Sequence, residues 1–189
     1  MNSDWQTSIA KADAADWITV TAYLFAAVLS IRASKQAWLR REPVENIFWR
    51  VTAGLLVFLS VNELLDLQTL LTAIGRQHAV QNGWYGNHRP VQYLFIIGLS
   101  VVAIIAGIFM LWLTRRAHSA VRVALVGLLL IGLFVLFRAA SFHHFDEVLG
   151  RGNPAFNLGS IQEMMGIIIV AGSATMYTYA YRRKNKRTN

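Results

Sequence analysis

Residues 91–113, VQYLFIIGLSVVAIIAGIFMLWL, decide the fold, because this long run contains no charged side chain. A bilayer core about 30 Å thick is crossed by a helix of about 20 mostly apolar residues. Lipid offers the backbone no hydrogen bonds, so a run of this kind crosses a membrane only as a helix. The segment therefore predicts a transmembrane helix.

Four further segments have a similar apolar character, and they comprise residues 17–31, 51–74, 123–145 and 158–181. Residues 1–16 are polar and lack the basic start of a signal peptide, so we expect the first helix to be retained. The fold class is therefore all-α: one integral membrane domain, residues 1–189, built as a bundle of about five transmembrane helices.

Basic residues are distributed unevenly between these segments. Thirteen of the 18 Lys and Arg residues follow the first helix, follow the third helix or lie in the C-terminal tail, which all fall on one side. The positive-inside rule places that side in the cytoplasm and the N-terminus outside. An odd number of helices separately requires the termini to lie on opposite sides. We expect an integral protein of the bacterial cytoplasmic (inner) membrane.

Composition excludes several classes of protein. The net charge of +8 is not arranged as a basic stripe interleaved with aromatic residues, so nucleic acid is not an expected partner. The chain has no cysteine, which rules out disulfides, thiolate metal sites and thiol redox chemistry. It also lacks a glycine-rich phosphate loop and a nucleophile elbow. The expected partners are membrane lipid and an amphipathic, lipid-like substrate.

The second predicted helix carries polar residues in the run SVNELLDLQT, residues 60–69. Counted from Val51 at the inner side of the membrane, Glu63 lies roughly 18 Å along the helix, just past the midplane. Asp66 lies roughly 22 Å along it, in the outer half. The two carboxylates are three residues apart and therefore share one face. Ionisable groups at this depth are costly and normally face the protein interior or water, where they serve a function.

The fourth predicted helix ends in FRAASFHHFDE, residues 137–147. Arg138 lies roughly 22 Å along this helix, at the depth of Asp66, and His143 and His144 lie roughly 30 Å along it. Asp146 follows in the same run, and Glu163 lies near the outer end of the fifth helix. Three helices therefore place acids, imidazoles and one guanidinium in one outer layer.

Two physical interpretations of this layer stay open. In the first, the carboxylates and imidazoles bind zinc, iron, manganese or copper. The candidate metal ligands are Asp66, His143, His144, Asp146 and Glu163. In the second, Arg138 pairs with Asp66 or Glu63. The histidines then only stabilise the C-terminal end of their helix by interacting with the helix dipole, and they bind no metal.

The leading functional hypothesis is a membrane-embedded enzyme whose site opens toward the outer face, with Glu63 and Arg138 as catalytic residues. Glu63 is expected to act as a general base, and Arg138 to hold an anionic or carbonyl group of the substrate. One alternative is a proton or metal-ion transporter or channel subunit that uses Glu63 and Asp66. A second is a structural or assembly subunit of a membrane complex. The nearly apolar inner halves of the helices favour a site reached from one side.

Small residues predict helix contacts. Ala103 and Gly107 lie four apart in the third helix, and residues 171–174 (AGSA) cluster in the fifth. Small side chains let helices approach closely in lipid.

Overall fold

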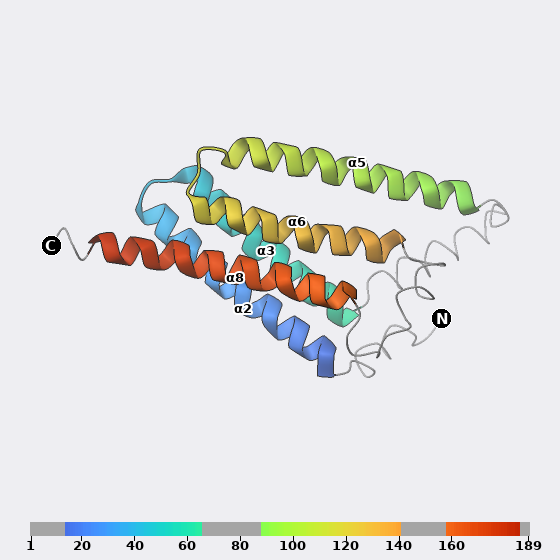
Figure 1. Ribbon diagram of the computed structural model, residues 1–189, viewed down its shortest axis with the longest axis horizontal. Coiled ribbons are helices and arrows are strands. Elements are labelled where there is room, and N and C mark those ends of the chain that lie inside the picture. Colours follow the sequence, from blue (N-terminus) through green and yellow to red (C-terminus); the bar gives the residue numbers. More distant parts are fainter. Residues whose placement is uncertain (1–13, 66–87, 141–157, 186–189) are drawn as a thin grey trace.

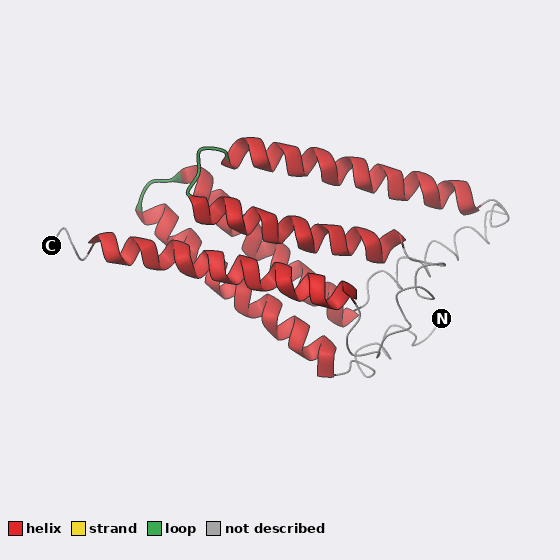
Figure 2. Ribbon diagram, viewed as in Figure 1, coloured by secondary structure: helices red, strands yellow, loops and turns green. Residues whose placement is uncertain are grey.

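The computed structural model describes residues 14–65, 88–140 and 158–185, and the regular structure within these ranges is entirely α-helical (Figure 2). The predicted all-α class is therefore confirmed for the described part of the chain. Its helices are α2 (Ala14–Leu39), α3 (Pro43–Leu65), α5 (His88–Thr114), α6 (Ser119–Ala140) and α8 (Leu158–Asn185).

The helices run side by side along the long axis of the molecule (Figure 1). α2 packs mainly against α3 and α8, and α6 packs mainly against α8, so these four helices form a bundle. α5 lies on the outside of α6 and makes only marginal contact with α3. The short α2–α3 and α5–α6 connections and the C-terminal end of α8 share one end of the bundle, here called the connection end. α2 and α8 begin at the other end, here called the opposite end.

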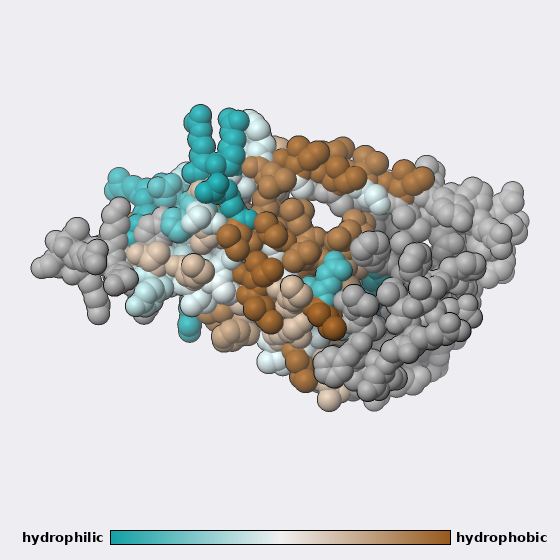
Figure 3. All heavy atoms as spheres, viewed as in Figure 1, coloured by the Kyte–Doolittle hydropathy of each residue, from teal (hydrophilic) through white to brown (hydrophobic). Residues whose placement is uncertain are grey.

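Three helical segments within the described ranges are long and apolar enough to cross a membrane: Ala14–Leu39, Pro43–Leu65 and Ser119–Leu136. Large apolar side chains also point outward, including Phe25, Ile105 and Ile168, each about 60% exposed. Figure 3 shows apolar residues across the middle of one face and hydrophilic residues gathered at the connection end. Soluble monomers rarely expose such large apolar patches, so this surface is suited to lipid.

A capped turn separates α2 from α3. The Glu42 N–H donates to the Ala37 carbonyl at 3.1 Å and the Arg41 N–H donates to the Trp38 carbonyl at 3.0 Å. These two bonds form a Schellman motif, which places its C′ residue in the left-handed region. Arg41 occupies that position with a φ of 62°, where glycine is the favoured residue.

The connection after the first helix is shorter than predicted. Residues 17–31 lie within α2, but the helix continues to Leu39 instead of ending before residue 33. The reason is packing, since Ala33 and Ala37 are fully buried and join a core cluster around Trp49. Pro43 does separate the two helices, and it stands at the first position of α3, where its missing N–H costs nothing.

α6 and α8 cross closely through a pair of glycines. A Cβ on Gly127 would lie 2.8 Å from the Gly166 carbonyl oxygen, and one on Gly166 would lie 2.9 Å from the Gly127 carbonyl oxygen. Near the crossing, the Gln162 side chain donates to the Leu130 carbonyl at 3.1 Å. The backbones touch here because neither residue has a side chain.

The predicted small-residue contacts are only partly those observed. Ser173 and Ala174 are buried in α8, as expected. Gly107 faces Leu129 of α6, with 3.3 Å between its built Cβ and the leucine Cδ2. A Cβ on Gly172, in contrast, would meet nothing within 4 Å, so this residue does not mark a contact.

Candidate functional site

The predicted proximity of Glu63 and Arg138 is confirmed. Arg138, near the end of α6, donates from Nη1 to Glu63 Oε2 at 2.8 Å. The sequence left Glu63 and Asp66 open as partners of this guanidinium; Glu63 is a partner, and Asp66 lies outside the described residues. The Glu63 side chain is 11% exposed and that of Arg138 is 36% exposed, so the carboxylate is the more enclosed member of the pair.

A second polar contact joins α2 to α8. The Tyr23 hydroxyl donates to Glu163 Oε1 at 2.7 Å, and both residues are buried. A buried tyrosine hydroxyl needs such a partner, because an unsatisfied donor in the interior is costly. Sequence reasoning selected Glu163 and missed Tyr23.

These two contacts border one small cavity near the opposite end of the bundle. Its volume is about 10 Å³, space for about one water molecule. The cavity is lined by Tyr23, Leu59, Asn62, Glu63, Phe134, Val135, Arg138 and Glu163. The lining comes from α2, α3, α6 and α8, so four helices converge on it. We call its ionisable members Tyr23, Glu63, Arg138 and Glu163 the four-helix cluster.

The remaining predicted ligands, Asp66, His143, His144 and Asp146, lie outside the described residues. Within residues 14–65, 88–140 and 158–185, no group of three or more His, Asp or Glu side chains is placed to hold a metal ion. The metal hypothesis therefore depends on residues that directly follow α3 and α6 in the sequence.

A different polar cluster, which sequence reasoning missed, lies at the connection end. Buried Glu45 accepts the Tyr177 hydroxyl on Oε2 at 2.5 Å and the His118 backbone N–H on Oε1 at 2.7 Å. His118 in turn begins α6, because its Nδ1 accepts the Ala120 N–H at 3.2 Å as an N-cap. We call Glu45, His118 and Tyr177 the capping cluster.

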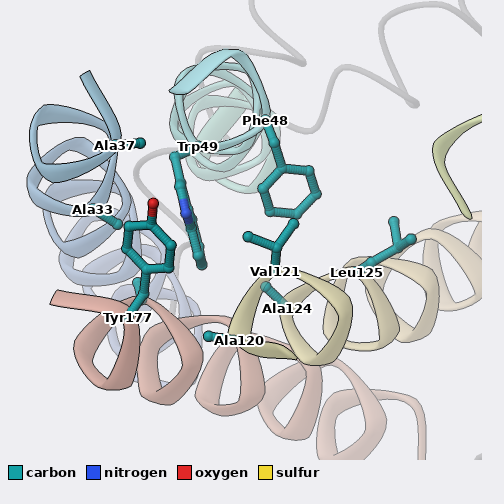
Figure 4. Close-up of a cluster of buried hydrophobic side chains, with 10 residues drawn as sticks. Ala33, Ala37, Phe48, Trp49, Ala120, Val121, Ala124, Leu125 and Tyr177 are labelled. Atoms are coloured by element: carbon teal, nitrogen blue, oxygen red, sulfur yellow. The ribbon is translucent and has the colours of Figure 1, made fainter. Parts of the chain in front are cut away.

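Aromatic packing encloses the capping cluster. Trp49 lies against the Tyr177 ring with 5.5 Å between centroids, and the His118 ring meets the same tyrosine edge-on at 5.6 Å. Figure 4 shows Trp49 and Tyr177 beside Val121 and the small residues of α2 and α6. Because both Glu45 oxygens are used and covered, this cluster serves to join α3, α6 and α8.

An apolar layer separates the two clusters. Glu45 and Glu63 are 18 residues apart in α3, about 27 Å along the helix axis. Between them Leu56, Ile131, Ile167 and Val170 pack together at 2% exposure or less. The polar groups at the two ends therefore do not form one continuous chain through the described interior.

No family model, curated protein or solved structure matches this chain. Its function is therefore inferred from the geometry of its own side chains.

Proposed function

We propose that this protein is a membrane-embedded enzyme that acts on an amphipathic, lipid-like substrate at the four-helix cluster. The observation that carries the proposal is the convergence of two carboxylates, a guanidinium and a tyrosine from four helices within an apolar bundle. Such groups are expensive in a membrane interior and normally mark a functional site.

The chemistry of the cluster suits acid–base catalysis. Glu63 is the proposed general base, and Tyr23 holds Glu163 in place beside it. Arg138 forms one hydrogen bond with the described residues, whereas a guanidinium has five N–H donors. Its remaining donors and its partial exposure suit it to hold an anionic or carbonyl group of a substrate.

A metal ion is part of the proposal. Asp66, His143, His144 and Asp146 would supply its ligands together with Glu163, and zinc, iron, manganese and copper all accept carboxylate and imidazole ligands. A bound metal would supply a water molecule of lowered pKa or a redox centre. The described residues would then orient the substrate through Arg138 and accept a proton on Glu63.

The membrane arrangement proposed here has all five helices crossing the bilayer, with the N-terminus outside and the connection end in the cytoplasm. Support comes from the gathering of basic residues at that end, including Lys35, Arg40, Arg115 and Arg122. The four-helix cluster would then open outward. The apolar layer beneath it favours an enzyme reached from one side over a pathway through both leaflets.

Comparison of lipid extracts tests the enzymatic proposal. Wild type, Glu63→Gln, Arg138→Lys and the control Gly172→Ala are expressed at matched levels, and extracts are compared by mass spectrometry with an empty-vector strain. We expect wild type and the control to change one class of amphiphile, and the two site variants to leave it unchanged. Identical extracts from wild type and from site variants that fold normally would contradict the proposal.

Elemental analysis tests the metal separately. Purified wild type is expected to contain a stoichiometric transition metal or zinc, and the Glu63→Ala, Asp66→Ala variant to lack it. A metal-free wild type that still alters the lipid extract would refute the proposed metal site and leave the proposed enzymatic function standing.

A further inference from the structure

A groove of about 600 Å³ runs along the outer surface of the α2–α3 hairpin near the connection end. Its volume is in the range of small-molecule binding sites. The α2 lining residues Ile31, Lys35 and Trp38 recur every three or four positions, as do Arg50, Gly54 and Val57 on α3. Each helix therefore presents one continuous face to the groove.

A polar contact fixes how the two faces align. The Ser34 hydroxyl donates to Asn46 Oδ1 at 2.7 Å, which holds α2 and α3 at one relative height. Lys35 adjoins this bond on α2, and Arg50 follows it by one turn on α3. Gly54 and Val57 lie one and two turns farther toward the opposite end. The groove is therefore cationic near the connection end and apolar beyond it.

The two cations of the groove lack counter-ions in the described part of the chain. Lys35 and Arg50 are exposed, and neither forms an ion pair there. The described acids that lie nearest in sequence to Arg50 include Glu45, which is occupied by Tyr177 and His118. A ligand with a negative charge complements this end of the groove.

The far end of the groove is open and apolar. A Cβ built on Gly54 would meet nothing within 4 Å, so the floor of the groove is bare backbone there. Val57 and Ile31 flank it with exposed aliphatic surface. An extended hydrocarbon chain fits between these walls along the helix axes.

We propose that this groove binds one anionic phospholipid. Lys35 and Arg50 hold the phosphate, and the exposed Trp38 ring lies at headgroup level, where tryptophan is favoured. One acyl chain lies along Gly54 and Val57. Basic pockets between transmembrane helices are suited to anionic headgroups in this way. The groove is separate from the four-helix cluster, so this proposal is independent of the proposed enzymatic function.

Native mass spectrometry of the full chain in detergent tests the proposal. The protein is titrated with dioleoylphosphatidylglycerol and, separately, with zwitterionic dioleoylphosphatidylcholine. We expect one phosphatidylglycerol to bind more tightly than any phosphatidylcholine. The Lys35→Gln, Arg50→Gln variant is expected to lose affinity for this first lipid by roughly thirty-fold, since two direct hydrogen bonds to the phosphate are lost and each contributes about a factor of five.

Two matched controls separate the groove from general surface charge. Arg116→Gln, Arg122→Gln removes the same charge from exposed positions at the connection end and is expected to leave the first binding event unchanged. Gly54→Leu fills the groove floor and is expected to abolish tight binding. Gly132→Leu introduces the same side chain at another glycine whose Cβ would meet nothing within 4 Å, and it is expected to have no such effect.

Three outcomes would overturn the proposal. Equal affinity for the two lipids would show that charge is not recognised. Equal losses in the two double charge variants, with Gly54→Leu unchanged, would show binding by diffuse charge outside the groove. A lipid-free dimer that Gly54→Leu converts to monomer would show that a second copy of the chain occupies the groove instead.

Discussion

Removing the charge of Arg138 is expected to destabilise the protein through the carboxylate it leaves behind. Arg138→Leu deprives Glu63 of its ion-pair partner, 2.8 Å away, while Glu63 keeps only 11% of its side-chain surface exposed. Breaking a fully buried ion pair costs about 3–5 kcal/mol. Arg138 is 36% exposed, which weakens the pair, so we expect a loss of about 2–3 kcal/mol.

The double variant distinguishes an ion pair from two separate packing effects. Glu63→Gln alone leaves Arg138 charged but partly exposed, and it should cost about 1 kcal/mol. In Arg138→Leu, Glu63→Gln no charge remains unpaired, so its loss should fall below the sum of the single losses by about 1–2 kcal/mol. The assay is equilibrium unfolding in detergent of wild type, both single variants and the double variant.

Chelation provides the second arm of this experiment. If Arg138 is the counter-ion of Glu63, a chelator should leave the coupling between the two residues unchanged. A cation bound by Glu63 would instead supply the countercharge, and Arg138→Leu would then cost little in metal-loaded protein. Additive single losses, within about 0.5 kcal/mol, would refute the ion-pair reasoning.

Three further predictions concern packing, backbone conformation and hydrogen bonding. Gly166→Ala should cost about 1–3 kcal/mol in thermal unfolding, because its Cβ would lie 2.9 Å from a backbone oxygen of α6, whereas Gly172→Ala should not destabilise. Arg41→Gly should exceed Arg41→Ala in stability by about 0.5–1 kcal/mol, since the φ of 62° favours glycine; equal midpoints would contradict this. Tyr177→Phe should cost about 1–3 kcal/mol by leaving buried Glu45 short of a donor, and adding Glu45→Gln should recover part of it.

Hydropathy was sufficient to predict the helices, because long apolar runs have few other structures in lipid. It was insufficient at their ends. The run of residues 33–39 contains Lys35 and Gln36, yet it stays helical because Ala33 and Ala37 pack against Trp49. Helix ends are set by tertiary packing and capping, and the hydropathy of a segment measures neither of these.

The candidate site was predictable where depth counting applies. Counts from separate starting points placed Arg138 at the depth of Asp66 and within about one helical turn of Glu63, and Arg138 forms an ion pair with Glu63. Tyr23 was missed because tyrosine is common in apolar segments. A signal was present, because Tyr23 lies on the same helix face as the small residues Ala26, Ala27 and Ser30, and this face is buried.

The two polar clusters differ in how fully their hydrogen-bonding groups are used, and this difference bears on function. In the capping cluster both oxygens of Glu45 accept a bond, one from Tyr177 and one from the His118 backbone. In the four-helix cluster, the described residues donate to only one oxygen each of Glu63 and Glu163. Glu45 is also buried at 6% exposure, so its oxygens are covered by the protein as well as hydrogen-bonded. Within the described residues, Glu63 and Glu163 each keep one oxygen that accepts no such bond, and this difference supports the proposal that chemistry takes place at the four-helix cluster while the capping cluster joins helices.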